Sequence, residues 1–280
     1  MKQTRSKNES SQGDAFTLLE LVVAITAAAL LALLTVPSLA RTGQSSKTIQ
    51  CLNNHRQLAR AWIMYCDDNE GKLPPNPDIS AIQTPAWVGG LLRWDLPPAA
   101  PYPDNTNSIL LSGALLGPYC NRCTTIYKCP EDVVPGVRGQ RVRSVSMNGQ
   151  MAGVVIGNPQ PINQYGGSLN YFIFHKRYEI NRPTPALAWV FIDEHADSID
   201  DGFFRVDMSS TTTWPEDIPA SYHGGRGILS FADGHAETKD WQDSSIKGLP
   251  VRAVHQSSPV TSNPNTDLLW LQTRTTSLPQ

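Results

Sequence analysis

FTLLELVVAITAAALLALLTV, residues 16–36, is an apolar stretch of 21 residues with a single charge, Glu20. As an α-helix rising about 1.5 Å per residue it would be about 32 Å long, enough to cross a hydrocarbon core of about 30 Å. We therefore expect a membrane-spanning helix over residues 16–37. A cleaved secretory signal is the alternative, but residues 37–40 (PSLA) match a small-residue cleavage site poorly.

Basic residues precede this stretch. Lys2, Arg5 and Lys7 lie before it, and such a bias places the N-terminus in the cytoplasm. The expected localisation is thus the inner membrane, single-pass, with a periplasmic or extracytoplasmic head. Glu20 is the unusual feature, because a carboxylate inside an apolar span is costly unless a partner satisfies it. The free α-amino group of a neighbouring subunit would be such a partner.

The start of the chain resembles type IV pilins and type II secretion pseudopilins, whose short basic leader precedes a Phe-Thr-Leu-x-Glu motif. With residues 1–15 as the leader and Phe16 as the first mature residue, Glu20 and Pro37 fall where that superfamily carries Glu and Pro. One departure is that Ala15, and not Gly, stands directly before Phe16.

The resemblance implies a processing and assembly route. Prepilin peptidase would cleave between Ala15 and Phe16 and methylate the new N-terminus. The subunit would then join copies of itself or other pseudopilins on an inner-membrane assembly platform, through Glu20 and Pro37. The resemblance implies a type II secretion or type IV pilus-like filament as the product, the latter a surface filament.

Residues 38–70 predict an amphipathic continuation of the same helix. No Pro or Gly interrupts residues 46–66, so a kink is expected only near Pro37 and Gly43. The expected apolar stripe, widened by three large side chains, consists of Ile49, Leu52, Ala59, Ile63, Cys66, Leu58, Trp62 and Tyr65. Gly71 ends the helix.

The rest of the chain predicts a globular β-rich head over residues 71–242 and a polar extension over 243–280. Runs 227–232 and 235–241 flank Asp-Gly, a strong hairpin signal. In the extension, residues 267–271 form a short apolar patch expected to dock on the head. The fold class is therefore α+β, with a long N-terminal helix packed on an antiparallel sheet, as in pilins.

His223, nine further residues and Asp233-Gly234 resemble the His-x9-Asp-Gly signature of prepilin-type proteins from planctomycete and verrucomicrobial bacteria. A metal or catalytic site of His223, Asp233 and His235 is one interpretation of these donors. Turn geometry alone explains the Asp-Gly pair and is favoured. Because no recognised catalytic motif occurs in the sequence, we expect no enzyme.

An acidic loop follows the apolar run 187–192, and pseudopilins of the major secretion type bind Ca²⁺ in the head, so the resemblance suggests a calcium site. Clustered oxygen ligands suit that ion, although a solvated loop is the favoured alternative because no EF-hand spacing is present. The candidate ligands are Asp193, Glu194, Asp197, Asp200 and Asp201.

Five cysteines leave at least one without an intramolecular partner. An extracytoplasmic location would favour disulfides, either within the group Cys120, Cys123 and Cys129 or between Cys51 and Cys129. A lone Cys-x2-Cys is only a weak zinc signal.

The composition excludes one broad class of function. Net charge is −2, and the 23 Lys and Arg residues are scattered along 280 positions, so no nucleic-acid footprint exists. The expected function is a non-enzymatic, filament-type structural subunit. A membrane-tethered binding protein that does not polymerise, and a metal-dependent enzyme, are the alternatives.

Overall fold

The computed structural model describes residues 17–77, 85–92, 94, 104–136, 139–152, 171–255, 259–262 and 265–278, with only the backbone of 29–45. The chain divides into two compact units, Met1–Ser45 and Ser46–Gln280. The leader, including Ala15, and Phe16 lie outside the described residues, as does the side chain of Pro37.

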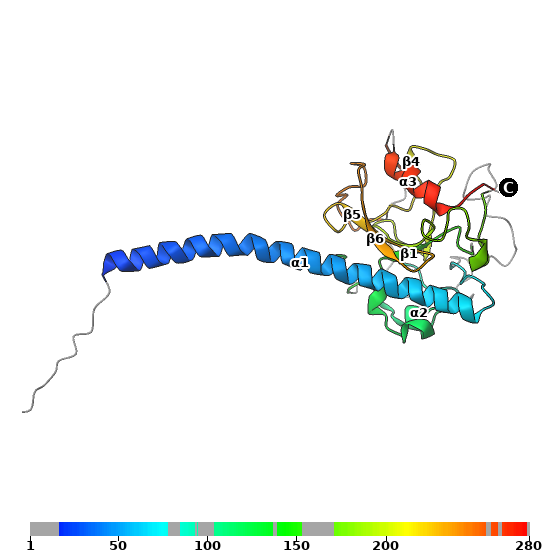
Figure 1. The fold of residues 1–280 in the computed structure, drawn as a ribbon, viewed down its shortest axis with the longest axis horizontal. Coiled ribbons are helices and arrows are strands. Elements are labelled where there is room, and N and C mark those ends of the chain that lie inside the picture. Colours follow the sequence, from blue (N-terminus) through cyan, green and yellow to red (C-terminus); the bar gives the residue numbers. More distant parts are fainter. Residues whose placement is uncertain are drawn as a thin grey trace, which may run out of the picture. The chain divides into compact units, whose positions relative to one another are not determined.

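All seven strands of the described residues lie between the second and third helices in the chain, so helices and strands are segregated as in other α+β proteins (Figure 1). The helices are α1 (Leu18–Asp68), α2 (Ile109–Ser112) and α3 (Thr266–Thr275), with 3₁₀ turns at Asp104–Thr106, Pro118–Cys120, Thr125–Tyr127 and Arg177–Glu179. The strands are β1 (Val145–Asn148), β2 (Trp189–Asp193), β3 (Phe203–Phe204), β4 (Thr213–Trp214), β5 (Arg226–Phe231), β6 (Ala236–Asp240) and β7 (Val260–Thr261).

A capping box fixes the start of α1. The backbone N–H of Thr17 donates to Oε2 of Glu20 at 2.9 Å, and the N–H of Glu20 donates to Oγ1 of Thr17 at 3.3 Å. This reciprocal Thr-x-x-Glu pair satisfies two N–H groups that the first helical turn leaves without backbone acceptors. The helix therefore begins at Leu18, and Glu20 has a local role that our interpretation of its charge did not include.

The prediction of a membrane-spanning helix over 16–37 is wrong. Among the residues described, no helix combines the length and the apolar character that a membrane crossing needs. The predicted single-pass inner-membrane localisation is contradicted by the same finding.

The second half of α1 packs on the head along most of the predicted stripe and departs from it at the first member. Ile49 is 55% exposed, whereas Thr48, Cys51 and His55 are buried. The buried stripe continues through Leu58, Trp62 and Cys66. Polar Thr48 and His55 belong to this face because both hydrogen-bond to buried groups of the head.

A five-stranded sheet with the order β3-β1-β2-β5-β6 forms the centre of the head. Pairs β1/β2, β2/β5 and β5/β6 are antiparallel, but β1/β3 is parallel. The expected all-antiparallel sheet is thus wrong for one pair, and the sheet is mixed. Strands β4 and β7 make a separate antiparallel pair.

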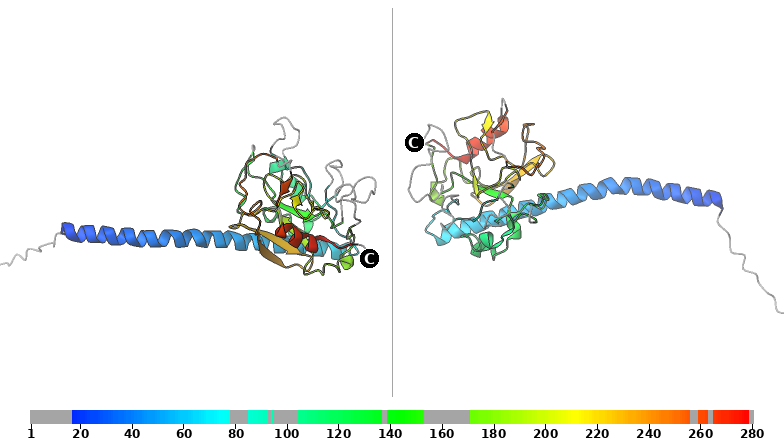
Figure 2. Two further views of the ribbon diagram at one scale, coloured as in Figure 1. Left: turned by 90° about the horizontal axis from the view of Figure 1, so that it is seen from above. Right: turned by 180° about the vertical axis from the view of Figure 1, so that it is seen from behind.

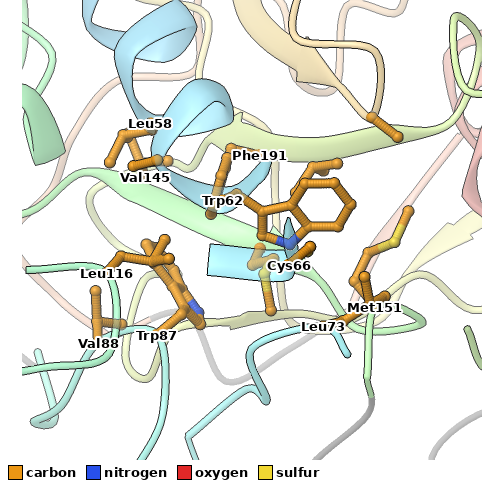
Figure 3. Close-up of a cluster of buried hydrophobic side chains, with 14 of the residues drawn as sticks. Leu58, Trp62, Cys66, Leu73, Trp87, Val88, Leu116, Val145, Met151 and Phe191 are labelled. Atoms are coloured by element: carbon orange, nitrogen blue, oxygen red, sulfur yellow. The ribbon is translucent and has the colours of Figure 1, made fainter. Parts of the chain in front are cut away.

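Two cores cover the two faces of this sheet. In Figures 1 and 2, α1 lies on one side and α3 on the other. The α1 side contains Trp62, Trp87 and Phe191, with Trp62 inserted among side chains from several segments (Figure 3). The other side contains Leu268 and Leu271 of α3. All five residues of β2 are buried, as a central strand between two cores requires.

The β5–β6 hairpin follows the Asp-Gly prediction in place but not in turn type. Gly234 has φ +96°, while Asp233 is not among the residues with positive φ. The N–H of Gly234 donates to the carbonyl of Phe231 at 2.9 Å, and the N–H of Phe231 donates to the carbonyl of His235 at 3.0 Å. This is a three-residue loop closed by a bulge at glycine, so only Gly234 requires the special backbone.

The apolar patch at residues 267–271 docks as predicted. It lies on α3, which Asn265 caps by accepting a hydrogen bond from the N–H of Leu268 at 2.9 Å. Leu268 and Leu271 are fully buried, and Asp267 pairs with Lys239 at 2.8 Å. The helix therefore closes the second core.

Candidate metal centre

Four side chains from four distant segments meet inside the head. Cys51 lies on α1, Cys129 follows the 3₁₀ turn at Thr125–Tyr127, Asp193 ends β2, and His223 lies in the turn before β5. One potential ligand atom from each residue lies within 4.8 Å of all the others. Each of these residues is at most 1% exposed.

The separations match those between ligands of a tetrahedral metal ion. Sγ of Cys129 lies 3.1 Å from Nε2 of His223, and Sγ of Cys51 lies 3.3 Å from Oδ2 of Asp193. Nε2 of His223 and Oδ2 of Asp193 are 3.7 Å apart. Zinc bond lengths of about 2.0–2.3 Å at tetrahedral angles imply ligand separations of about 3.3–3.8 Å. The four groups thus need only small shifts to share one ion.

Local hydrogen bonds position three of the four groups. The N–H of Cys129 donates to Oγ of Ser144 at 2.7 Å, which fixes the loop at the edge of β1. The carbonyl of Asp193 accepts from the N–H of Ala220 at 2.8 Å, tying the end of β2 to the segment before His223. The N–H of His223 donates to the carbonyl of Arg226 at 3.2 Å across a turn containing two glycines with positive φ.

Two further side chains contact the atoms of His223 and Asp193 that point away from the centre of the cluster. Nδ1 of His223 lies 3.2 Å from Oγ1 of Thr48, and Nε2 of His55 lies 3.1 Å from Oδ1 of Asp193. With the proton of His223 on Nδ1 and donated to Thr48, Nε2 keeps its lone pair for the cluster. Metal-binding histidines and carboxylates are commonly held by such outer partners. Both partners come from α1, one turn to either side of Cys51.

The cluster is strongly polarised without an ion. Burial opposes ionisation of Asp193, but His55 and His223 outweigh it and lower the pKa of this carboxyl to about 2. Burial likewise opposes the charge on His223, yet Asp193 and Cys129 raise its pKa to about 10. Burial raises the pKa of Cys51 well above its usual value, whereas contacts with Cys51 and His223 lower that of Cys129 despite burial. Without an ion, Asp193 and His223 thus form a buried pair of opposite charges.

A Cys-His-Asp catalytic triad is a second way to combine these groups, but the geometry disfavours it. In a triad the acid holds the imidazole nitrogen opposite the nucleophile. Here Cys129 and Asp193 both face Nε2 of His223, and Thr48 lies at Nδ1. Burial also removes the thiols from any substrate. Convergence on one point is what a metal ion requires, and not what nucleophilic catalysis requires.

No protein-family model, curated protein or solved structure matches the chain. The resemblance to pilins and pseudopilins therefore rests on the residues quoted from the sequence, and the site is interpreted from its own geometry.

The structure separates the three donors proposed around the His-x9-Asp-Gly signature. His223 is buried in the cluster, while Asp233 and His235 form an exposed pair 2.6 Å apart at the tip of the hairpin. The ring of His235 stacks on Phe231 at 4.3 Å. The two ends of the motif nevertheless share a neighbour. His223 contacts Thr48, and a Cβ at Gly234 would meet Ile63, both on α1.

The five acidic residues proposed for Ca²⁺ do not converge. Among the described residues, the metal-ligand group found contains Asp193 and none of the other four. Glu194 accepts hydrogen bonds from Ser146 and Ser198, and burial raises its pKa well above its usual value. The carboxylate of Asp197 accepts from the N–H groups of Arg252 and Ala253.

The last two acidic residues flank a buried arginine. Asp200 and Asp201 present their carbonyls to Arg143, and Oδ1 of Asp201 accepts from the N–H of Phe203 at 2.7 Å. The loop is thus organised by protein donors.

All five cysteines, each within the described residues, are unpaired. Cys120 lies near the hydroxyl of Tyr127, 3.6 Å away, and Cys123 is exposed beside Thr125. Only Cys51 and Cys129 are neighbours in the cluster.

Sequence reasoning missed Thr48 and His55. A signal was present, because both lie at helical spacing on the face that carries Leu58 and Trp62. Polar residues on the apolar face of a helix require partners, and so indicate a buried polar site.

Proposed function

We propose that this protein is a non-enzymatic structural subunit that assembles with copies of itself, or with related subunits, through the N-terminal part of α1. The observation that supports this proposal is the apolar surface at the start of the helix. Six of its large apolar side chains are between 50% and 81% exposed. They are Leu18, Leu19, Leu21, Val22, Val23 and Ile25.

A continuous apolar surface of this kind is characteristic of a contact site. Helices with such surfaces bury them against one another through ridges-into-grooves packing. A second copy offers the same surface, and its processed N-terminus would offer a positive charge to Glu20. The motifs at Phe16, Glu20 and Pro37 support the same arrangement, since pilins and pseudopilins assemble through this segment. Prepilin peptidase would act first, between Ala15 and Phe16.

Glu20 provides the sharpest test because it has two separable roles. It caps its own helix with Thr17, and in an assembly its charge would pair with the Phe16 amino group of a neighbour. Glu20→Gln retains a capping oxygen and loses the charge. Thr17→Ala weakens the capping box and retains the charge. Glu20→Ala removes both.

The experiment is chemical crosslinking of the full chain in its native host, followed by gel sizing, with protease resistance of the head as the folding control. We expect fewer multimers for Glu20→Gln, none for Glu20→Ala, and nearly normal multimers for Thr17→Ala. If Thr17→Ala is as defective as Glu20→Ala while Glu20→Gln assembles normally, capping is the role of Glu20. Undiminished multimers in Glu20→Ala would contradict pairing of Glu20 with the Phe16 amino group of a neighbour.

Processing is tested separately by N-terminal sequencing of the mature protein. The expected first residue is Phe16. A mature chain that still begins at Met1 would contradict the pilin-like assembly route.

A further inference from the structure

We propose that Cys51, Cys129, Asp193 and His223 bind one structural Zn²⁺ ion that fixes α1 to the head. This inference rests on the cluster alone and does not depend on how the protein assembles.

The donor set selects the kind of ion. Two sulfurs, one imidazole nitrogen and one carboxylate oxygen are ligands that Zn²⁺ accepts in tetrahedral sites. Ca²⁺ and Mg²⁺ require oxygen ligands and higher coordination numbers, which Cys51 and Cys129 do not supply. Soft thiolate ligands instead favour zinc among the common divalent ions.

Charge balance supports the same ion. Asp193 and the thiol groups of Cys51 and Cys129 are withdrawn from water, and an uncompensated buried charge is strongly unfavourable. A divalent cation would neutralise two of the three negative charges of a thiolate, thiolate and carboxylate set. The outer oxygen of Asp193 is held by Nε2 of His55 at 3.1 Å.

The site is closed, and this makes it structural. All four tetrahedral positions are occupied by protein ligands, each at most 1% exposed. Catalytic zinc sites keep one position for water or substrate, and structural sites do not. The ion would join one helix, one loop, the end of β2 and the turn before β5.

Such an ion would stabilise the head by mass action. A ligand that binds only the folded state adds about 4 kcal/mol at a concentration 1,000-fold above its dissociation constant. An unfolded chain holds these four residues far apart, so metal binding and docking of α1 are coupled.

The deciding experiment is a metal titration of the full chain after reduction and removal of bound metal. Co²⁺ reports directly on ligation, because thiolate ligands give a charge-transfer band and a tetrahedral site gives intense visible absorption. We expect saturation at about one Co²⁺ per chain, displacement by Zn²⁺, and a higher thermal midpoint with either ion.

Matched cysteine variants identify the ligands. Cys51→Ser and Cys129→Ser should each abolish the thiolate band or shift it to weaker intensity, and the double variant should lack it. Cys66→Ser is the control, because Cys66 also lies buried on α1 but outside the cluster. It should bind Co²⁺ with unchanged stoichiometry.

Three results would overturn the proposal. One is a wild-type chain that shows no thiolate-to-cobalt band. Another is an unchanged band in the double variant. The third is a stable Cys51–Cys129 disulfide in the native protein, detected as an intact mass lower by two hydrogens that reduction restores. Should the cysteine variants fail to fold, the wild-type titration and the variant Asp193→Asn test the site instead. Asn retains the side-chain shape of Asp193, and this variant should weaken Co²⁺ binding at least tenfold.

Discussion

Replacement of Gly234 by alanine should destabilise the head by about 1–2 kcal/mol. Gly234 has φ +96°, and forcing a residue with a Cβ into such backbone costs about 1–3 kcal/mol. Reduced freedom of the unfolded chain offsets about 0.4–1 kcal/mol of this cost. The new Cβ would also lie 3.2 Å from Cδ1 of Ile63 on α1, which must then move by a few tenths of an ångström.

A matched control separates the backbone effect from this contact. Gly248 has φ +75° and nothing within 4 Å of an added Cβ, so Gly248→Ala should show the backbone cost alone. Ile63→Val removes Cδ1, so it should relieve part of the cost in a double variant with Gly234→Ala. Denaturant unfolding of the four single and double variants gives the coupling energy directly.

The result that refutes this reasoning is a Gly234→Ala variant no less stable than Gly248→Ala and without coupling to Ile63. The Asp-Gly end of the His-x9-Asp-Gly motif would then have no role in docking α1. A positive coupling would explain both ends of the motif by contact with one helix.

Three further predictions concern buried groups of the head. Asp132→Asn should cost about 3–5 kcal/mol in denaturant unfolding, because it removes the negative charge that lies 2.7 Å from buried Arg141. Adding Arg141→Met should recover part of this loss, and a double variant as unstable as Asp132→Asn alone would contradict the prediction. Leu271→Ala should cost about 2–5 kcal/mol by thermal unfolding, since Leu271 is fully buried, whereas Leu269→Ala, at 40% exposed, should cost far less. Asp217→Asn should gain stability relative to wild type as the pH rises from about 5 to about 8, because burial and nearby carboxylates raise the pKa of Asp217 in the folded state. The folded wild-type protein binds this proton more tightly than the unfolded chain, so wild type loses stability as the proton leaves at higher pH. Parallel curves of stability against pH for the two proteins would contradict the prediction.

The sequence predicted features that depend on local pattern. The Asp-Gly pair located the β5–β6 hairpin, although its loop has three residues. Parallel pairing of β3 with β1 involves only two residues of β3, too short a segment for periodicity to reveal.

The buried face of α1 was predicted correctly from Leu52 to Cys66 but not at Ile49, which is exposed. Apolar periodicity placed Ile49 inside and left out Thr48 and His55, which are buried because their hydrogen-bond partners lie in the head. A polar side chain with a buried partner lies inward without any apolar signal.

The candidate site shows the same limit more clearly. Its four ligands were each noticed in the sequence, but in three different roles. Cys51 and Cys129 were a possible disulfide, Asp193 a calcium ligand, and His223 part of a motif. Their convergence depends on how α1, β2 and β5 pack together, and no spacing in the sequence encodes that distance.

Cys51 and His223 stand 172 positions apart (223 − 51), and this separation affects the order of folding. At translation rates of about 5–20 residues per second, His223 is made roughly ten to thirty seconds after Cys51. During that interval the part of α1 with Cys51 and Leu52 lacks Ile228 of β5, on which it packs. The second half of α1 is thus synthesised early and buried late, which exposes it to chaperones and to premature contacts between nascent chains.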